Sequence, residues 1–533
     1  MGAGPLDYLI IGAGPAGLQV AHQLEASGRE YLVLESGNGP GTFFTRYPRH
    51  RQLISINKPH TGTSDRELNL RMDWNSLLSD HPDLLFTQYS RRYFPSADDM
   101  VRYLGDYARE LGLRVDYETS ATAVSPAAEG FEVADSRGRT HLARRLIVAT
   151  GVGHPYIPAI DGIELAEQYA EVPVDPDDFT DQRVLIIGKG NSALETADNL
   201  LETAAVIHVA GPSSMRLAWR THYVGHLRAV NNNFLDSYQL KSQNAILDGT
   251  VQSISRDADG MLTVRFAFSR ANEVVKELRY HRVIACTGFR FDPQIFAPDC
   301  RPTLVHNDRL PKLTSAYEVD GVPGMYVAGT LTQQLDFKHG TNGFIHGFRY
   351  GARALSKILE MRYHQVPWPS VPVAATAQEI AVAVLARVNR TSALWQQFGV
   401  LGDVVLRGPD GSARYLDEVP VGLVHDGELA ALAGPADILV ITLEYGPDHD
   451  KVDPFDVSVA RVAQDDAERA FDASYLHPVV RLYRAGTLVA THHVAENLEN
   501  EWDKAVHRDP LVAFLTAHAT APDTSAGLSA AGR

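Results

Sequence analysis

The sequence predicts an α/β protein with two βαβ-based domains and a smaller C-terminal α+β domain. A unit of strand, glycine-rich turn, helix and strand spans residues 7–35, and a second unit of the same kind spans Val184–Ala210. The proline-rich stretch Pro367–Pro372 predicts a rigid linker. Beyond it, residues 375–515 have the pattern of one helix, several strands and a helical end.

The composition describes an ordinary globular chain. At 533 residues, with 44% hydrophobic and 21% charged residues, it is long enough for roughly two to four domains. The net charge of -16 argues against nucleic acid as a partner, because phosphate binding favours a basic surface. No apolar run approaches the length of a membrane span, and the start lacks a signal-peptide pattern. We therefore expect no membrane contact and a cytoplasmic location.

The first unit carries the glycine fingerprint Gly12–Gly17 between an apolar strand and a helix. Gly12 permits the tight turn, Gly14 lets the backbone approach a pyrophosphate, and Gly17 lets helix and strand pack closely. The helix N-terminus offers N–H groups and the positive end of its dipole to the phosphates. Glu35 ends the next strand, where a carboxylate can accept both ribose hydroxyls. This context predicts a dinucleotide site in a Rossmann-like domain.

The second fingerprint is Gly188–Ala193, in which Ala193 replaces the third glycine, a permitted variant. Its second strand ends at Ala210 without an acidic residue, and Ser213, Ser214 and Arg216 follow. A carboxylate there would repel a 2′-phosphate, whereas hydroxyls and a guanidinium can bind one. The second unit is therefore predicted to bind a nicotinamide cofactor, and NADPH in preference to NADH.

Two nucleotide units in one chain, with Thr150-Gly151 and Thr287-Gly288 at strand ends, resemble the flavoproteins that bind two dinucleotides. In that class the N-terminal unit holds FAD and the inserted unit holds the nicotinamide, which allows a hydride relay. We expect a discontinuous FAD-binding domain at 1–155 and 283–366, an NAD(P)H-binding domain at 156–282, a C-terminal α+β domain at 373–516 and a disordered tail at 517–533.

A second segment is expected to close the flavin site. Tyr326–Thr330 resembles the strand-end motif beside the FAD ribityl chain, with Thr330 in place of the usual aspartate. The helix predicted at Gly343–Arg362 would aim its N-terminus at the flavin and stabilise negative charge there. The residues expected to bind FAD are Gly12, Gly14, Pro15, Ala16, Gly17, Glu35, Thr42, Phe43, Thr150, Gly151, Gly329, Thr330 and Phe344. Those expected to bind NADPH are Gly188, Gly190, Asn191, Ser192, Ser213, Ser214 and Arg216.

Several longer runs resemble the FAD-dependent oxidoreductase domain-containing protein 2 family. They cover nearly the whole chain: Phe43–Arg51, Leu53–Lys58, Asp73–Leu78, Tyr89–Phe94, Thr221–Gly225, Gly343–Tyr350 and Ala490–Val494. Animal members of that family are secretory-pathway flavoproteins linked to the degradation of misfolded proteins. This chain departs from them, because it shows no signal peptide and ends Ala-Ala-Gly-Arg533 without a retention tetrapeptide. We expect a bacterial-type member and carry over neither location nor partners.

The wider resemblance is to class B flavin monooxygenases. Leu53–Asn57 looks like the segment in which those enzymes place an asparagine near the reacting face of the flavin. The resemblance makes Asn57 the catalytic candidate, as a hydrogen-bonding partner of NADP or of oxygen activated at the flavin C4a. Tyr169 stands where the second marker of the class has a histidine.

The leading hypothesis is a FAD-dependent, NADPH-using monooxygenase that hydroxylates a small polar substrate, amine- or amino-acid-like, with O2. Lys58, Arg290 and Lys338 are the cationic residues that would bind such a substrate. One alternative is an NADPH oxidase or reductase that acts on a protein partner. Another is a flavin-bound interaction protein without catalysis.

The remaining reactive residues predict no further chemistry. Cys286 and Cys300 lie fourteen positions apart with no Cys-x-x-Cys pair, which argues against a dithiol reductase. We expect no metal site: His492 and His493 would face opposite sides of a strand, and the aspartates at 448–453 lack a calcium-loop pattern. The C-terminal domain is expected to cover the catalytic unit or to mediate homodimer contacts.

Overall fold

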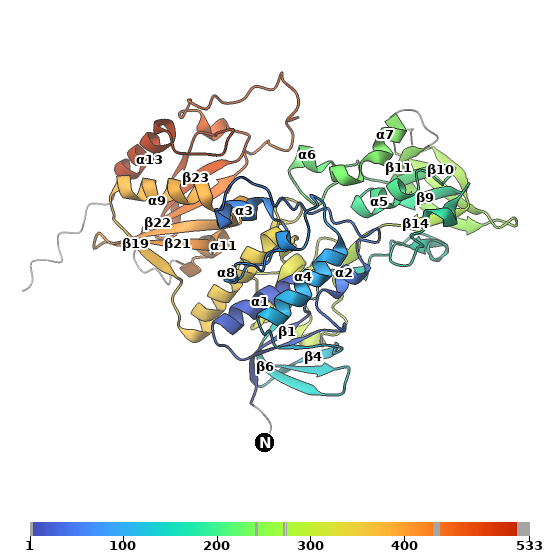
Figure 1. The fold of residues 1–533 in the computed structure, drawn as a ribbon, viewed down its shortest axis with the longest axis horizontal. Helices are drawn as coiled ribbons and strands as arrows, with labels where there is room; N and C mark the ends of the chain where they lie inside the picture. The colour runs from blue at the N-terminus through green and yellow to red at the C-terminus, as the bar shows by residue number, and fades with distance from the viewer. Residues whose placement is uncertain (1–3, 240–243, 270–271, 273, 430–436, 520–533) are drawn as a thin grey trace, which may run out of the picture. The chain divides into compact units, whose positions relative to one another are not determined.

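The computed structural model describes residues 4–239, 244–269, 272, 274–429 and 437–519, so most of the expected tail lies outside the described residues (Figure 1). The chain forms two compact units, each assembled from separate stretches. The first contains residues 1–18, 31–58 and 79–312, and the second contains residues 19–30, 59–78 and 313–533. Within the described ranges, no helix is both long and apolar enough to cross a bilayer.

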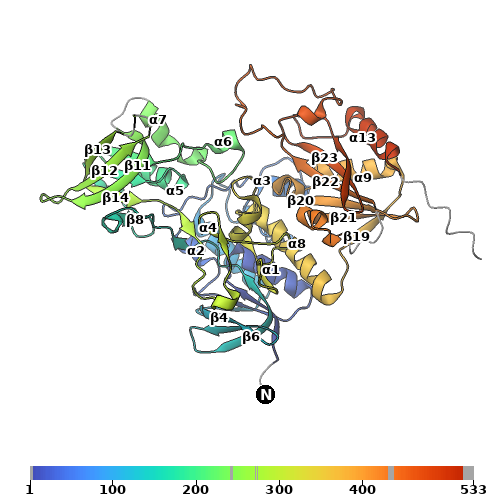
Figure 2. The ribbon, with the colours of Figure 1, turned by 180° about the vertical axis from the view of Figure 1, so that it is seen from behind.

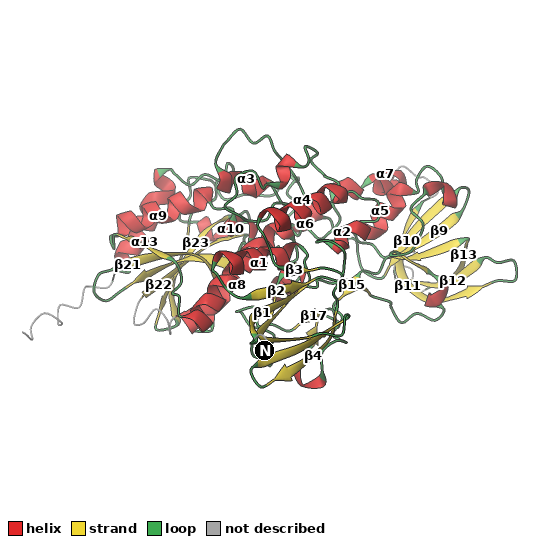
Figure 3. Ribbon diagram, turned by 60° about the horizontal axis from the view of Figure 1, so that its bottom comes forward, coloured by secondary structure: helices red, strands yellow, loops and turns green. Residues whose placement is uncertain are grey.

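The first sheet of the first unit has the strand order β3-β2-β1-β6-β5-β4 (Figure 3). Its strands are β1 (Leu6–Ile11), β2 (Tyr31–Leu34), β3 (Val115–Asp116), β4 (Ala121–Ala127), β5 (Gly130–Asp135) and β6 (Thr140–Val148). Central β1 runs parallel to β2 and β6, and Tyr8 pairs with both Tyr31 and Arg145. Leu9 and Ile10 of β1 are fully buried, as expected for a central parallel strand.

Helices follow the strands of this sheet; the helix after the first strand was predicted, whereas α2 (Thr42–Arg46) lies in a stretch expected to be loop. α1 (Pro15–Ala26) begins directly at the fingerprint, and α2 follows β2. α4 (Ala97–Glu110) is capped by the Ser96 hydroxyl, which accepts the Asp98 N–H at 3.0 Å. The helical spacing of apolar residues predicts a helix over residues 98–111, and the observed helix begins and ends one residue earlier.

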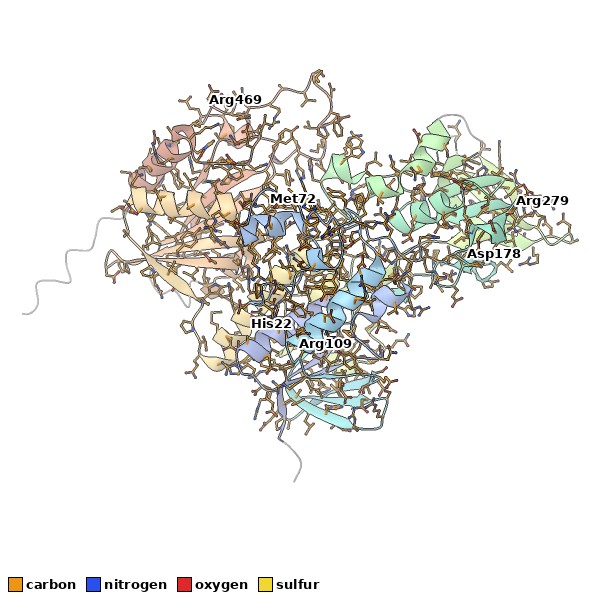
Figure 4. All side chains as sticks on the ribbon, viewed as in Figure 1. His22, Met72, Arg109, Asp178, Arg279 and Arg469 are labelled. Atoms are coloured by element: carbon orange, nitrogen blue, oxygen red, sulfur yellow. The ribbon has the colours of Figure 1, made fainter. Side chains whose placement is uncertain are left out.

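The second sheet has the order β13-β12-β11-β10-β9-β14-β8. Its strands are β8 (Glu167–Gln168), β9 (Arg183–Ile187), β10 (Val206–Gly211), β11 (Ala245–Arg256), β12 (Leu262–Phe268), β13 (Val275–Tyr280) and β14 (Arg282–Ala285). β9 lies between parallel β10 and β14, while β11 to β13 form an antiparallel meander. Arg279 on the outermost strand, β13, is labelled in Figure 4. The fingerprint helix α5 (Asn191–Asn199) follows β9.

The sequence of residues 211–250 has the composition of a long polar connection, but the described part of this stretch contains two short helices, α6 (Ala218–Thr221) and α7 (Asn233–Gln239), and the start of β11. Leu227 and Phe234 from this stretch are buried in the same apolar cluster as Ala193 and Leu194 of α5. These apolar residues are too widely spaced to show a helical period, so only tertiary packing identifies them.

The short elements of the first unit connect its two sheets. They are β7 (His154–Pro155), β15 (Phe289–Arg290), β16 (Leu304–Val305) and β17 (Leu310–Pro311). β15 pairs with β7 in an antiparallel ribbon.

The second unit contains a long helix, α8 (Ile345–His364), and a sheet of order β19-β21-β20-β22-β23-β24 (Figure 2). The other elements are α3 (Arg66–Met72), β18 (Met325–Val327), β19 (Ser370–Val373), α9 (Ala377–Arg390), α10 (Ala393–Gln396), β20 (Leu401–Arg407), β21 (Ala413–Pro420), α11 (Val421–His425), β22 (Asp437–Glu444), β23 (His477–Arg484), β24 (Thr487–His493) and α13 (Ala505–Ala517).

The predicted proline linker includes a strand. β19 pairs antiparallel with β21 at the edge of the sheet, where a proline without an N–H is tolerated. On β24, His493 hydrogen-bonds His477 at 2.9 Å, whereas the ring of His492 stacks on Phe514. The two histidines therefore face opposite sides, as predicted.

Two of the family-like runs meet inside the second unit. Arg349 on α8 is fully buried and donates to the backbone carbonyls of Leu70, Asp73 and Ser76 at 2.7–2.9 Å. These hydrogen bonds hold the segment 70–78 against α8. A charge buried this deeply requires such partners, which explains why an arginine is present in a helix core.

Candidate functional site

The first fingerprint contains two glycines that the fold itself requires. Gly12 has a φ of 103°, and a Cβ at Gly17 would lie 1.9 Å from the Gly12 carbonyl oxygen. Gly14 differs, because its φ is not positive and a Cβ there would meet no atom within 4 Å. The protein alone gives no reason for a glycine at this position. An approaching pyrophosphate at the N-terminus of α1 does, so the site fits FAD.

Glu35 is held rigidly at the end of β2. Its side chain is buried, and Oε2 accepts the Ala13 N–H at 2.7 Å. Oε1 accepts the Gly37 N–H at 2.9 Å and the Thr42 hydroxyl at 2.8 Å. A carboxylate oxygen has two lone pairs, so Oε2 can still accept from a ribose hydroxyl. Thr42 was predicted to contact FAD, and in the structure its hydroxyl orients this carboxylate.

The other FAD candidates of the first unit surround the fingerprint or follow β6. Pro15 is the first residue of α1, which suits its missing N–H, and Ala16 is buried behind it. Phe43 is 46% exposed and packs on Tyr47, with ring centroids 5.0 Å apart. Thr150 and Gly151 lie just beyond β6.

The second unit carries the remaining FAD candidates. Gly329 begins a 3-10 helix (Gly329–Asp336), and the Thr330 hydroxyl donates to the Gly343 carbonyl at 3.3 Å. Phe344 precedes α8, whose first turn has neither an acidic residue nor a side-chain cap. No acidic side chain or cap in this turn neutralises the positive end of the α8 dipole, and its predicted role beside the flavin stays a prediction.

Asn57 is fully buried, and its hydrogen-bond partners identify which atom of its amide is the nitrogen. Its Nδ2 donates to the carbonyls of Ser90 at 2.7 Å and Arg92 at 3.2 Å, which only an NH2 group can do. Its Oδ1 is buried without a hydrogen-bond partner among the described residues. A buried acceptor without a donor is unfavourable in the protein alone, which suggests that a bound molecule donates to it.

In the second fingerprint, too, one glycine is required by the fold and another leaves space for a ligand. A Cβ at Gly188 would lie 2.2 Å from the Cys286 carbonyl oxygen, so the fold needs this glycine. A Cβ at Gly190 would meet nothing within 4 Å, which again leaves room for a pyrophosphate. Ser192 lies in the first turn of α5. The structure therefore fits a second dinucleotide at this helix N-terminus.

Asn191 has a different role from the predicted cofactor contact. Its Nδ2 donates to the carbonyls of Gly225 at 3.2 Å and His226 at 2.9 Å, and its Oδ1 accepts the Arg228 N–H at 3.0 Å. The side chain thus anchors the loop 225–228 to the start of α5. The family-like run Thr221–Gly225 leads into this loop.

The region expected to hold the 2′-phosphate lies beyond β10. Ser213, Ser214 and Arg216 are all exposed. The register places Asp248 of β11 beside Gly211 at the end of β10, and Lys189 forms an ion pair with this aspartate. The sequence pattern predicted the position of an acid only for β10, so Asp248 on the neighbouring strand β11 was missed. The ammonium group of Lys189 offsets its charge, so a 2′-phosphate is not excluded.

A partly buried carboxyl on α5, that of Glu195, links this helix to the segment that follows α2. Glu195 Oε1 accepts the Tyr169 hydroxyl at 3.2 Å and the His50 N–H at 3.0 Å, and the Tyr169 oxygen accepts the Arg49 N–H at 3.1 Å. Burial raises the pKa of Glu195 to about 7 and lowers the pKa of His50 to about 4. Tyr169 was singled out as a departure from a histidine, whereas Glu195 went unnoticed. Its position four residues after Asn191 on one helix face was the available signal.

Burial disfavours the reactive form of both thiols. Cys286 is buried, and burial raises its pKa to about 12. Cys300 is also buried, its thiol donates to the Val124 carbonyl at 3.5 Å, and burial raises its pKa as well. Both thiols are free and protonated near neutral pH, and a thiolate is the reactive form.

The three cationic candidates for substrate binding lie in different segments. Lys58 and Lys338 are exposed, and Arg290 is half-buried on β15.

Comparisons with known proteins agree with this geometry. The family model described as pyridine nucleotide-disulphide oxidoreductase matches residues 9–329. FAD-dependent oxidoreductase domain-containing protein 2 of Mus musculus is 40% identical over 561 residues, covering 96% of this chain and 83% of that protein. The flavin-containing monooxygenase of Stenotrophomonas maltophilia shares the fold, with a TM-score of 0.51 and 21% identity over 67% of this chain and 98% of its own. The bacillithiol disulfide reductase of Staphylococcus aureus has a TM-score of 0.51 and 19% identity over 67% of this chain and 99% of its own. Both structures show the two-dinucleotide architecture.

Proposed function

Because the chain belongs to the pyridine nucleotide-disulphide oxidoreductase family and to the family of FAD-dependent oxidoreductase domain-containing protein 2, we propose that it is an NADPH-dependent flavin monooxygenase of a small polar substrate. Family membership implies FAD and NAD(P)H as its cofactors, and the open space at Gly14 and Gly190 accommodates one pyrophosphate at each fingerprint. Bound FAD supplies two-electron chemistry, accepting a hydride from the nicotinamide and delivering the electrons to oxygen. One oxygen atom enters the substrate and the other leaves as water.

The absence of a usable dithiol supports direct transfer from flavin to acceptor. A disulfide reductase passes electrons through two adjacent thiols, of which at least one must ionise readily. The thiols of Cys286 and Cys300 are buried, and their pKa values are raised. A small acceptor that reaches the flavin itself suits these residues better.

The observation that carries the proposal is the buried, partnerless Oδ1 of Asn57. Two carbonyls hold the amide, so this acceptor is fixed before any ligand arrives. A fixed acceptor in a dry site stabilises a donor O–H or N–H more strongly than water would, because it needs no reorganisation. We assign Asn57 the role of positioning the reacting oxygen.

We infer NADPH as the reductant and an amine or amino-acid-like molecule as the substrate. Exposed Arg216 and the serines Ser213 and Ser214 can bind a 2′-phosphate, and Asp248, the acid beside Gly211, is paired with Lys189. Each of the cations Lys58, Arg290 and Lys338 suits the carboxylate of an amino-acid-like substrate.

Rapid mixing tests the proposal. The protein with bound FAD is reduced anaerobically by NADPH and then mixed with oxygen while the visible flavin absorbance is recorded. We expect NADPH to bleach the flavin, and the return of oxidised flavin to show a delay that is long compared with oxygen binding. Immediate return with release of stoichiometric hydrogen peroxide would instead identify an oxidase. If neither NADPH nor NADH bleaches the flavin, the protein does not use a nicotinamide cofactor to reduce its flavin and the proposal fails.

The variant Asn57→Ala separates the two steps. Reduction by NADPH should stay within about threefold of wild type, whereas the delay after oxygen mixing should shorten about tenfold, the effect of one lost hydrogen bond. Asn199→Ala is the matched control, because that amide donates to the backbone carbonyl of Val174 at 3.1 Å and lies outside both fingerprint turns. An unchanged delay in Asn57→Ala would contradict the assigned role.

A further inference from the structure

A cavity of about 460 Å³ opens on one face of the C-terminal sheet, and every residue that lines it belongs to that domain. β22 and β23 form its floor, with Val440 paired opposite Arg481. α11 and the turn at Phe398 contribute its sides. Ligand pockets commonly span roughly 300–1,000 Å³, so the cavity can hold a small molecule. None of the roles assigned to the two fingerprints uses it.

Aromatic rings make up much of the cavity wall. Tyr445 and His449 stack with ring centroids 4.8 Å apart and planes at 20°. Phe398 meets Tyr445 edge-on at 5.2 Å and 89°. Tyr483 is anchored by its hydroxyl, which lies 3.0 Å from His425 Nε2. Such walls favour a planar ring that can stack or meet an edge.

The charged groups of the lining neutralise each other. Apart from the histidines, the described lining residues include one acid and one base, Glu444 and Arg481. Both guanidinium Nη atoms donate to the carboxylate, with Nη2 2.8 Å from Oε2. A charged ligand would therefore add an unpaired charge in a partly buried site, which is unfavourable. A neutral polar ligand adds no such charge, and the wall carries hydroxyls and ring nitrogens of both donor and acceptor type.

We propose that this cavity binds an uncharged planar aromatic or heteroaromatic molecule with a hydrogen-bonding edge, such as a carboxamide. The aromatic rings favour a flat ligand, and the ion pair between Glu444 and Arg481 makes a charged ligand unfavourable. The polar groups of the wall can orient the hydrogen-bonding edge of the ligand. The C-terminal domain thereby gains a small-molecule site of its own.

Three probes of nearly the same shape test this proposal in the full-length protein with bound FAD at pH 8: benzamide, benzoate and benzylammonium. Saturating NADP+ is present, so that a benzamide cannot occupy the nicotinamide position. Calorimetry or ligand-observed NMR gives the dissociation constants. We expect benzamide to bind about tenfold more tightly than either charged probe. Binding of a charged probe in preference to benzamide, or saturable binding of none of the three, would overturn the proposal.

Substitutions show where the ligand binds and test why the site prefers an uncharged ligand. Val421→Trp fills the cavity and should abolish benzamide binding, whereas Val382→Trp on α9, where the valine is 47% exposed, should leave it unchanged. Benzamide binding that survives Val421→Trp means a site elsewhere and refutes the proposal. Glu444→Gln leaves Arg481 unpaired and should shift the preference toward benzoate. If Glu444→Gln lowers the melting temperature, the comparison of Val421→Trp with Val382→Trp tests the proposal without it.

Discussion

Replacing Gly14 by alanine separates a glycine that a ligand requires from glycines that the fold requires. A methyl group at this position meets no protein atom within 4 Å. The carbonyl of Gly14 accepts the first helical hydrogen bond, from Leu18 N at 3.0 Å, so the residue acts as a helix cap. Glycine is favoured over alanine at a helix N-cap, so this change should cost about 0.5–1 kcal/mol of helix stability. The free energy of unfolding of the apoprotein should therefore fall by no more than about 1 kcal/mol.

FAD binding should respond much more strongly. The added methyl group occupies the path of the pyrophosphate, and overpacking of one or two carbon atoms costs about 1–3 kcal/mol. This corresponds to FAD affinity weaker by about 10- to 100-fold. Titration of apoprotein with FAD, followed by the quenching of flavin fluorescence, measures the loss.

Two matched variants define the result. Gly17→Ala places its Cβ 1.9 Å from the Gly12 oxygen and should lower the stability of the apoprotein itself. Gly105→Ala in α4 also points into open space and should leave FAD binding unchanged while slightly stabilising the helix. The reasoning fails if Gly14→Ala binds FAD within threefold of wild type, or if its apoprotein is destabilised as much as that of Gly17→Ala.

Three further changes test other parts of the account. Gly190→Ala should raise the KM for NADPH about tenfold or more and leave FAD content unchanged, because the open space lies at the second fingerprint. Arg216→Ala should raise the KM for NADPH about tenfold and leave that for NADH unchanged, while Arg265→Ala, an exposed arginine on β12, should affect neither. Glu195→Gln tests the partly buried carboxyl through the pH dependence of urea unfolding. Since the folded pKa is raised from 4.5 to about 7, the native state binds the proton more tightly. Stability is therefore lost as pH rises from 4.5 to 7, by up to about 3 kcal/mol. The glutamine variant should lack this loss, and equal pH profiles for wild type and Glu195→Gln would argue against a raised pKa.

The parts of the fold that follow from local pattern were predicted closely. Both βαβ units, α4 and α8 lie within a few residues of the predicted bounds, because apolar periodicity and glycine punctuation are local signals. β19 was missed because pairing with β21, some forty residues away, makes a strand of a proline-rich stretch.

The glycines of the candidate site could be predicted from the sequence, whereas the hydrogen-bond partners of its side chains could not. The role of Gly14 follows from sequence spacing alone. That Thr42 orients Glu35, or that Asn191 anchors a loop, depends on which carbonyls and carboxylates long-range packing brings near. Asp248 shows the same limit, because a parallel neighbour strand supplied the acid that the fingerprint strand lacks.

An anaerobic titration of the FAD-loaded protein with NADPH tests most directly the claim that electrons pass from one nucleotide to the other without a thiol pair. The account predicts complete bleaching of the flavin at one NADPH per FAD, with no further NADPH consumed. An end point at two NADPH per FAD would show a redox-active disulfide and contradict the account, as would a flavin that NADPH leaves oxidised.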